Sequence, residues 1–450
     1  MLKTPDSDKV KQILKIATPC IAEQLLMFSV SIVSIAVIGH LGSGELVAAA
    51  MTNTIVNWLQ SIYTGLASGG TVVIARIWGS GDKQGAKKSF MQTLIIAVTL
   101  STAILLITMT FQKQLVLLFF GNAHNDILDK INIYFFYSMI GMPATAVTTV
   151  INAGVRGAGD NKTPFFTTAV LNIINLVLSL ILIHGMPSIG IPSMGIAGAG
   201  IAISCARYAG MIFSILITLY KKSPILPGKL TIRLEKDIIA RILKIGFPSM
   251  LEQLIFNGGF VILQAMLIGF GTAFQGGYQI GANLNGLTNA PVLGLSVAVT
   301  VLISHALGKR DFEQADEIVR ISRFLTIGVF VLLGLMLFIF APVITRIYTS
   351  DHQVLKSGTF FARVFGILLI PIAYFQIMAA ILRGSGDVRY VAVTSIIGLW
   401  VMRIFVVWLI GRLSGNGYIA VVIGLSLDFV LRAFMYHVRV RKGKWKYIRI

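Results

Sequence analysis

The chain has 450 residues, of which 56% are hydrophobic and only 12% charged, and its formal net charge is +20. A soluble domain usually carries about a quarter charged residues, so this composition excludes a soluble globular protein. The apolar residues fall in long runs, such as 94–110 and 327–340, whereas the strands of a membrane barrel would alternate polar and apolar side chains. We therefore expect an all-α integral membrane protein.

Runs of mostly apolar residues predict twelve transmembrane helices along the chain. They lie at 14–39, 46–76, 89–112, 131–155, 164–185, 195–220, 242–269, 277–306, 323–346, 357–382, 390–411 and 416–438. The first run exceeds 20 residues and has no small-residue cleavage site, so we interpret it as a retained helix and not as a signal peptide. The two cysteines lie in apolar stretches, and no histidines have the spacing of metal ligands. We expect no disulfide framework, no metal site and no bound cofactor.

Positive charge is distributed unevenly between the two sides of the predicted membrane protein. Most of the 38 Lys and Arg residues fall on the side that holds both termini. The positive-inside rule then places both termini in the cytoplasm of a multi-pass protein of the cell membrane. This distribution argues against nucleic acid as a partner, and the basic tail at 441–446 is interpreted as an anchor for lipid headgroups. The opposite loops hold only Lys113, Lys130, Arg346, Lys356 and Arg412.

Two halves of the sequence resemble each other. The segment KIATPCIAEQLL (15–26) returns as KIGFPSMLEQLI (244–255), and RGAGD (156–160) returns as RGSGD (383–387). Six helices per half start both halves on the same side, which predicts two six-helix bundles related by a pseudo-two-fold axis along the membrane normal. We take 1–220 and 242–450 as the halves and 221–241 as a cytoplasmic linker. Such repeats serve alternating access in transporters, so we favour a transporter over a channel, a receptor or scaffold, or an enzyme.

Several motifs resemble those of a known family. RGAGDNKTP (156–164) and RGSGD (383–387) are similar to the paired loop signatures of the multidrug and toxic compound extrusion (MATE) family, and GYQIGANL (277–284) is similar to that family's eighth helix. The segments WVMRI (400–404), LDFVLRA (427–433) and GKW (443–445) resemble bacterial members near its DinF branch. The resemblance covers essentially the whole chain.

The resemblance implies a secondary antiporter that exports organic, often cationic and amphiphilic compounds in exchange for H⁺ or Na⁺. We expect a monomer whose partners are a small organic substrate, the coupling cation and membrane lipids. The alternative within the same superfamily is a flippase for a lipid-linked or polyanionic substrate, which basic residues inside the helices would suit.

The acids that the family uses for coupling are not at their usual places. By alignment, Ser34 and Ser179 stand where the DinF-like branch has aspartates, while Asn175 matches the family asparagine. Phe256 and Ile372 stand where the NorM branch has acids. Ser34, Asn175 and Ser179 are expected either to line a polar substrate cavity or to form ordinary hydrogen bonds between helices.

Glu23 and Glu252 are the candidate ion-coupling residues. Each lies four residues after a proline inside a predicted span, and an ionisable group within the membrane is a functional suspect. The alternative is that each carboxylate is wetted near the cytoplasmic end or bonded to a neighbouring helix. The polar residues beside them are further candidates to line the cavity: Gln24, Gln253 and Asn257.

Four more charged residues fall within predicted spans. Arg403, Asp428 and Arg432 are expected to form a structural charge cluster, because an Arg–Asp pair neutralises two costly charges. Arg207, the approximate repeat counterpart of Arg432, is grouped with this cluster, and its own partner is open: lipid headgroups or an anionic substrate.

Overall fold

Every regular element in the structure is a helix. A computed structural model describes residues 7–121, 125–187, 190–226, 234–349 and 351–448. Within these ranges the only extended pairing is a single bridge between Met186 and Ile191. The predicted all-α class is confirmed for the described part of the chain.

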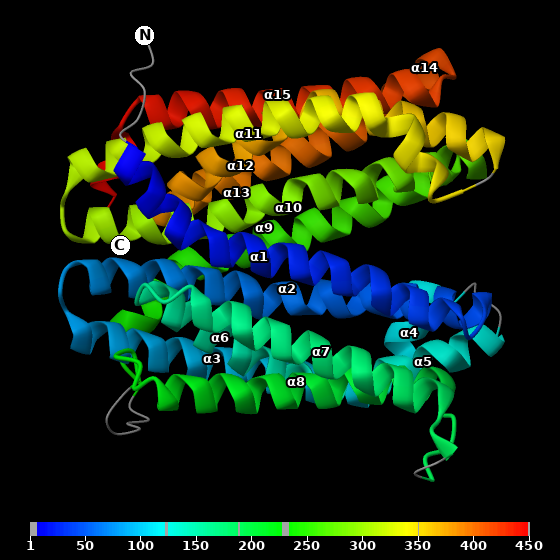
Figure 1. Cartoon of the computed structure of the whole chain (residues 1–450), viewed down its shortest axis with the longest axis horizontal. Coiled ribbons are helices and arrows are strands. Elements are labelled where there is room, and N and C mark those ends of the chain that lie inside the picture. Colours follow the sequence, from blue (N-terminus) through cyan, green and yellow to red (C-terminus); the bar gives the residue numbers. More distant parts are fainter. Residues whose placement is uncertain (1–6, 122–124, 188–189, 227–233, 350, 449–450) are drawn as a thin grey trace. The chain divides into compact units, whose positions relative to one another are not determined.

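The helices up to residue 220 carry the first six predicted spans (Figure 1). The short helix α4 was not predicted, and the predicted helix at 131–155 is divided in two by a bend of 44°. The elements are α1 (Ser7–Gly39), α2 (Ser43–Gly79), α3 (Lys83–Thr110), α4 (Gln112–Phe120), α5 (Asn125–Ile140), α6 (Met142–Gly157), α7 (Lys162–His184) and α8 (Gly195–Tyr220).

The helices from residue 236 onward carry the other six. The predicted helix at 390–411 is interrupted by the π-helix η2, and a short 3₁₀ helix follows the last span. The elements are α9 (Lys236–Ile268), α10 (Thr272–Gly308), α11 (Phe312–Arg346), α12 (His352–Ser385), α13 (Val388–Ile396), η2 (Ile397–Phe405), α14 (Val406–Ser414), α15 (Gly417–Arg441) and η3 (Lys444–Tyr447).

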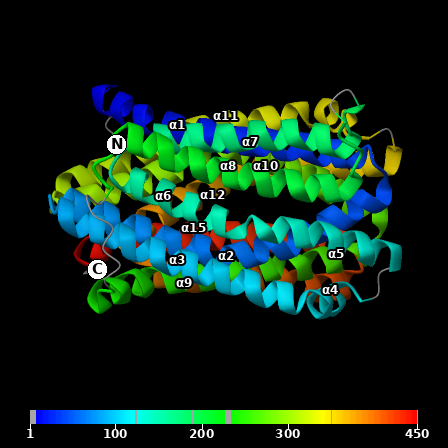
Figure 2. The same ribbon diagram turned by 90° about the horizontal axis from the view of Figure 1, so that it is seen from below.

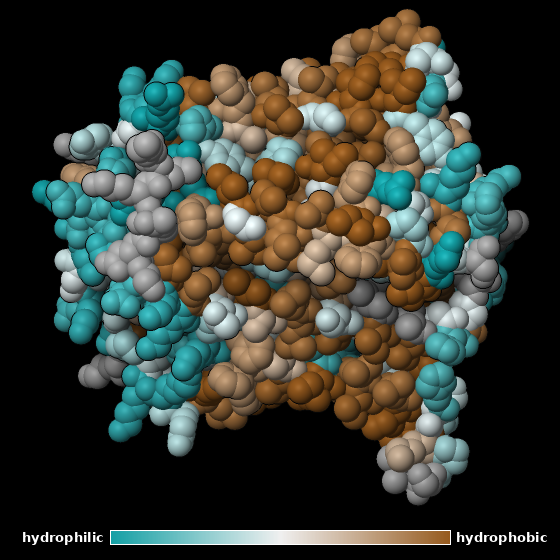
Figure 3. Space-filling model, turned by 45° about the horizontal axis from the view of Figure 1, so that its top comes forward, coloured by the Kyte–Doolittle hydropathy of each residue, from teal (hydrophilic) through white to brown (hydrophobic). Residues whose placement is uncertain are grey.

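Most of the helices are apolar enough to cross a bilayer. Ten candidate spans are found among the described residues, and the bent pair α5–α6 makes an eleventh. The twelfth predicted span is α2, which is 37 residues long but does not reach the same apolarity. Figure 3 shows apolar side chains over the middle of the helices and hydrophilic side chains gathered at their ends, as lipid contact in the middle and water at the ends require.

The chain forms two compact units whose boundaries fall inside helices. The N-terminal unit comprises Leu26–Met250, and the C-terminal unit comprises Met1–Leu25 with Leu251–Ile450. The division therefore runs through the middle of α1 and of α9, whereas the predicted linker at 221–241 lies within one unit. Lys229 and Arg233 of that linker are outside the described residues.

Each unit contains the first part of one helix whose remainder belongs to the other unit. A glycine packs closely against that first part. In the N-terminal unit, a Cβ on Gly65 of α2 would lie 2.4 Å from the Met250 backbone of α9. In the C-terminal unit, a Cβ on Gly294 of α10 would lie 2.5 Å from the Ile21 backbone of α1. Both pairs are related by the offset of 229 residues seen in the sequence. Small residues let transmembrane helices approach closely. The two halves therefore share this close helix contact as well as their sequence pattern.

Within each unit the helices run alongside one another (Figures 1 and 2). In the C-terminal unit α12 packs along α10, α11 and α15, and in the N-terminal unit α2 packs against α3, α5 and α6. The beginning of α1 and the end of the chain meet the same turns of α11. Lys9 Nζ lies 2.7 Å from Glu317, and Lys446 Nζ lies 2.6 Å from Asp316. The described ends of the chain thus lie at one end of the C-terminal unit.

Candidate functional site

Glu252 lies in a buried polar network of the C-terminal unit. Its side chain is 9% exposed, and its Oε1 accepts hydrogen bonds from Arg383 Nη2 at 2.7 Å and from Ser395 Oγ at 2.8 Å. Glu252 is on α9, Arg383 is near the end of α12, and Ser395 is on α13. One carboxylate therefore joins three helices, and its negative charge is what holds Arg383.

The network continues onto α15 through Tyr436. The Tyr436 hydroxyl lies 3.1 Å from Ser395 Oγ and donates to the Val391 carbonyl at 3.0 Å. The tyrosine and the serine are both buried. A change of charge on Glu252 would therefore be felt by α9, α12, α13 and α15 together, because hydrogen bonds in such a low-dielectric network are strong.

The other charge of the RGSGD motif is also paired within this unit. Arg439 Nε of α15 donates to Asp387 Oδ2 at 2.7 Å, and the Arg439 guanidinium lies 5.0 Å from the ring centroid of Tyr390. Both charged residues of the motif, Arg383 and Asp387, thus make ion pairs with other helices. The repeat of the motif and its resemblance to a family loop signature singled out this segment, but neither indicated the partners of its two charges.

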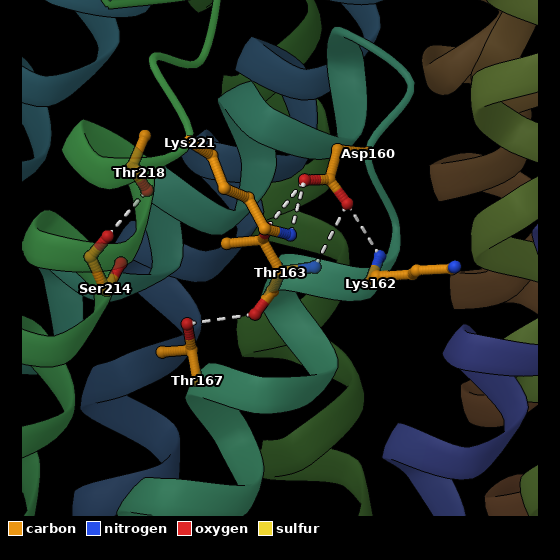
Figure 4. A network of polar contacts seen from close by, with 7 residues as sticks. All are labelled: Asp160, Lys162, Thr163, Thr167, Ser214, Thr218 and Lys221. Carbon is orange, nitrogen blue, oxygen red and sulfur yellow. Dashed lines mark hydrogen bonds and ion pairs between the residues drawn. The ribbon is translucent and has the colours of Figure 1, made fainter.

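The first copy of the motif uses its aspartate differently (Figure 4). Asp160 accepts hydrogen bonds from the backbone N–H groups of Lys162 and Thr163, at 2.9 and 3.1 Å, and from the Thr163 hydroxyl at 2.6 Å. Lys221, just after α8, lies 3.4 Å from Asp160 and 2.8 Å from the Thr163 hydroxyl. Burial raises the pKa of Asp160, but these hydrogen bonds and the Lys221 charge outweigh it and hold the pKa below its usual value.

A compact charge cluster lies inside the C-terminal unit. Asp428 Oδ2 is 2.5 Å from Arg403 Nη2, and Asp428 Oδ1 is 2.5 Å from Arg432 Nε. All three side chains are at most 3% exposed. The structure thus brings together three of the four residues predicted to form this cluster, and the group carries one more positive than negative charge. Arg207 belongs to the N-terminal unit.

Aromatic rings surround the two guanidiniums. Arg432 lies 4.5 Å from the ring centroid of Phe375 and 5.7 Å from that of Phe256, and Arg403 lies 4.6 Å from that of Phe429. Ring faces attract cations, so the rings compensate part of the excess charge. Phe256, which the family resemblance aligned with an acid of the NorM branch, lies beside the Arg432 guanidinium here.

Arg207 braces the break between α5 and α6 in the N-terminal unit. Its Nη1 donates to the Ser138 carbonyl at 2.7 Å, and Ser204, one turn earlier on α8, accepts from the Gly141 N–H at 3.1 Å and donates to the Tyr137 carbonyl. The Tyr208 hydroxyl donates to the Ile140 carbonyl at 3.1 Å. A broken helix leaves backbone groups unsatisfied, and α8 satisfies them. The hydrogen-bond acceptor of Arg207 in the structure is thus the Ser138 carbonyl, at the negative end of α5.

The predicted cavity residues are distributed over three helices. Asn175 and Ser179 are both buried and lie one turn apart on the same face of α7. Asn175 Oδ1 has no hydrogen-bond partner among the described residues. The ion-coupling candidate Glu23, which was not among the predicted cavity residues, is 4% exposed on α1. The remaining members are partly exposed, on α1 and α9: Gln24, Ser34, Gln253 and Asn257.

A family model and several relatives match this chain. The model of the MatE family matches residues 19–181 and 248–436. A probable multidrug resistance protein NorM of Thermotoga maritima is 25% identical over 97% of this chain and 93% of its own length. The probable multidrug resistance protein YoeA of Bacillus subtilis is 21% identical, over 83% of this chain and 80% of its own length.

Solved structures match in fold. The Vibrio cholerae MATE transporter VcmN in the bent form aligns with a TM-score of 0.86 and 21% identity, over 98% of this chain and 99% of that one. A transporter of the MOP superfamily from Pyrococcus furiosus, described as having a binding pocket of reverse polarity that suggests a different function, aligns with a TM-score of 0.89 and 20% identity, over 98% and 97% of the two chains. These matches confirm the predicted fold class of twelve helices in two bundles.

Proposed function

The chain belongs to the MatE family of transporters, and from this we propose that it is a secondary antiporter. It exports organic, often cationic and amphiphilic compounds in exchange for H⁺ or Na⁺, by alternating access. The observation that carries the proposal furthest is the buried carboxylate of Glu252, held by Arg383 of the repeated RGSGD motif. A group that binds a cation reversibly inside the membrane is what ion coupling needs.

The pairing of Glu252 suggests how an ion would act on the structure. A proton that binds the Glu252 carboxylate removes the charge that holds Arg383, and a sodium ion would compete with the guanidinium for the same oxygens. Either event weakens the link between α9, α12 and α13, and when the ion leaves the link forms again. A cation could thus shift the balance between two states of these helices. Glu23, the repeat counterpart on α1, is proposed as the second coupling residue.

Polar side chains within the spans are the proposed lining of the substrate path. Asn175 and Ser179 form a polar stripe on α7, and an unsatisfied amide oxygen such as that of Asn175 is available to a ligand. An organic cation needs few such groups, because apolar and aromatic surfaces supply most of the contact in ligand sites. The other proposed members are Gln24, Ser34, Gln253 and Asn257.

The location we propose is the cell membrane, with both termini in the cytoplasm and the chain acting as a monomer among lipids. Support comes from the basic residues at the end of the C-terminal unit that holds both ends of the chain. Lys9 and Lys446 both pair with acids at the beginning of α11. Cytoplasmic loops carry an excess of Lys and Arg.

The second candidate function is a flippase for a lipid-linked or polyanionic substrate. Arg403, Asp428 and Arg432 carry an excess positive charge in the interior of the C-terminal unit. A unit that binds a cationic substrate would be expected to carry excess negative charge in its interior. This charge favours an anionic group as the substrate of that unit.

The test is transport by the full-length chain in proteoliposomes. A fluorescent cationic dye and a labelled phospholipid are followed in parallel, with an H⁺ gradient, a Na⁺ gradient or neither. We expect dye movement only when one of the gradients is imposed. Lipid movement without any gradient-dependent dye movement would overturn the antiporter in favour of the flippase, and no movement of either would contradict both.

A further inference from the structure

A cavity of about 680 Å³ opens in the C-terminal unit where α11 begins and α15 ends. Its walls carry mostly positively charged side chains. Five of its lining residues carry or can carry positive charge: Arg320, Arg323, His437, Arg441 and Lys446. One acid lines it, Asp316.

Part of this charge is neutralised by the protein, and two arginines are left without an ion pair among the described residues. Asp316 is occupied by Lys446 at 2.6 Å, and Arg320 is 3.4 Å from Glu317. Arg323 and Arg441 form no ion pair with any described residue, and Arg323 Nε is buried without a hydrogen-bond partner. Guanidinium groups that no carboxylate engages are available to an anion from outside the protein.

The C-terminal tail builds one wall of the cavity. The chain turns at Gly443, whose φ of +68° is in the left-handed region, and the Trp445 side chain then enters the core at 1% exposure. The Trp445 indole donates to the Val440 carbonyl at 2.9 Å, and the Tyr447 ring lies 5.3 Å from that of Phe312. Lys446 of the tail is therefore held against α11, where it pairs with Asp316.

The inner wall is polar and ordered. The Arg323 guanidinium lies 5.9 Å from the ring centroid of Tyr374, and the Tyr374 hydroxyl is 2.6 Å from His437 Nδ1. Arg323 directly precedes the apolar stretch of α11, at 324–344. Its depth is therefore that of the membrane interface, where lipid phosphates lie.

We propose that this cavity binds a phosphate group, either the phosphodiester of a membrane lipid or free phosphate. Guanidiniums bind phosphate oxygens by paired, charge-assisted hydrogen bonds, and Arg323 and Arg441 supply donors that no carboxylate of the described chain engages. This site is separate from the residues proposed for transport, so it stands whether or not the chain is an antiporter.

The test compares two double variants that remove the same charge. Arg323→Gln with Arg441→Gln changes the lining, whereas Lys442→Gln with Lys444→Gln changes exposed tail residues outside it. Native mass spectrometry counts the phosphatidylglycerol and phosphatidylcholine molecules that the purified full-length protein retains in an uncharged detergent. We expect the wild type to prefer phosphatidylglycerol, the arginine variant to bind it about tenfold more weakly, and the lysine variant to be within about twofold of wild type.

Inorganic phosphate distinguishes the two sources of the ligand. If phosphate displaces phosphatidylglycerol, or raises the melting temperature of the wild type but not of the arginine variant, the site takes the free ion too. If it does neither, the lipid is the ligand. Equal losses in both double variants, or no loss in either, would overturn the proposal. Melting without ligand checks folding, and Arg441→Gln alone, at an exposed side chain, serves if the double variant does not fold.

Discussion

The two units carry a buried arginine at approximately equivalent places, Arg207 in α8 and Arg432 in α15, and stabilise it by different means. Arg432 shares the carboxylate of Asp428 with Arg403 and lies against phenylalanine rings. Arg207 forms no ion pair with any residue that the structure describes, and it donates to the Ser138 carbonyl. A duplicated sequence can thus keep a cation while its counter-charge changes from a side chain to the end of a helix.

The helices that pack against these two arginines also differ between the units. Pro143 and Pro371 are equivalent to within one residue of the repeat, yet α5–α6 breaks by 44° before Pro143 while α12 runs through Pro371 as one helix. Proline removes one helical hydrogen bond in both cases. The break occurs where Ser204, Arg207 and Tyr208 satisfy the freed backbone groups. An equivalent proline alone therefore does not account for the break, which coincides with hydrogen bonds from α8.

The largest effect is expected from removing the acid of the C-terminal cluster. Asp428→Asn leaves two buried guanidiniums without a counter-charge and should lower stability by about 3–5 kcal/mol. Thermal unfolding of the purified protein measures this. Replacing all three residues by Met or Leu should recover most of the loss, and an Asp428→Asn protein as stable as the wild type would show that the cluster is not held by charge.

A smaller loss is expected in the N-terminal unit. Arg207→Met removes one charge-assisted hydrogen bond to a carbonyl and leaves no buried acid behind, so we expect a loss of about 1.5–3 kcal/mol by the same unfolding measurement. Arg207→Lys should restore part of it. A loss larger than that of Asp428→Asn would reverse the comparison.

The break itself can be probed at Gly141. A Cβ there would lie 2.7 Å from Arg207 Cδ and 2.9 Å from Ser204 Oγ, so Gly141→Ala should destabilise by about 1–2 kcal/mol through overpacking. Gly328 of α11 is the control, because a Cβ there would meet nothing within 4 Å. Gly328→Ala should be neutral or slightly stabilising. Equal effects at both positions would argue against close packing of Arg207 and Ser204 on Gly141.

The smallest effect concerns the first RGxGD motif. The folded-state pKa of Asp160 is lowered, so its contribution to stability is present above the unfolded pKa and is lost as the pH falls through the folded value. Asp160→Ala should lower stability by about 1 kcal/mol near neutral pH, a loss typical of a side chain that accepts from the first N–H groups of a helix. The difference from wild type should shrink as the pH falls toward the lowered folded pKa. Unfolding followed from pH 7 down into the acid range tests this, and a difference independent of pH would contradict it.

The positions of the spans could be predicted because long apolar runs have few alternatives in a membrane. All twelve predicted spans fall on helices, and the family predicted from the motifs was confirmed. The break at Gly141 could not be predicted from Pro143, because the equivalent Pro371 leaves α12 as one helix. The partner of Glu252 was equally hidden, because Arg383 is 131 residues away. The repeat indicates that both motifs matter, but not that they meet.

The measurement that tests the coupling proposal most directly separates dye movement through the substrate path from its coupling to an ion gradient. In proteoliposomes, dye exchange at equal ion concentrations needs only the substrate path, whereas uphill dye transport needs the coupling ion. For Glu252→Gln we predict dye exchange within about threefold of wild type and loss of gradient-driven transport, because the amide cannot take up the ion. Ser395→Ala, which keeps the carboxylate, should retain both. Equal loss of exchange and driven transport, or unchanged driven transport, would contradict a coupling role for Glu252.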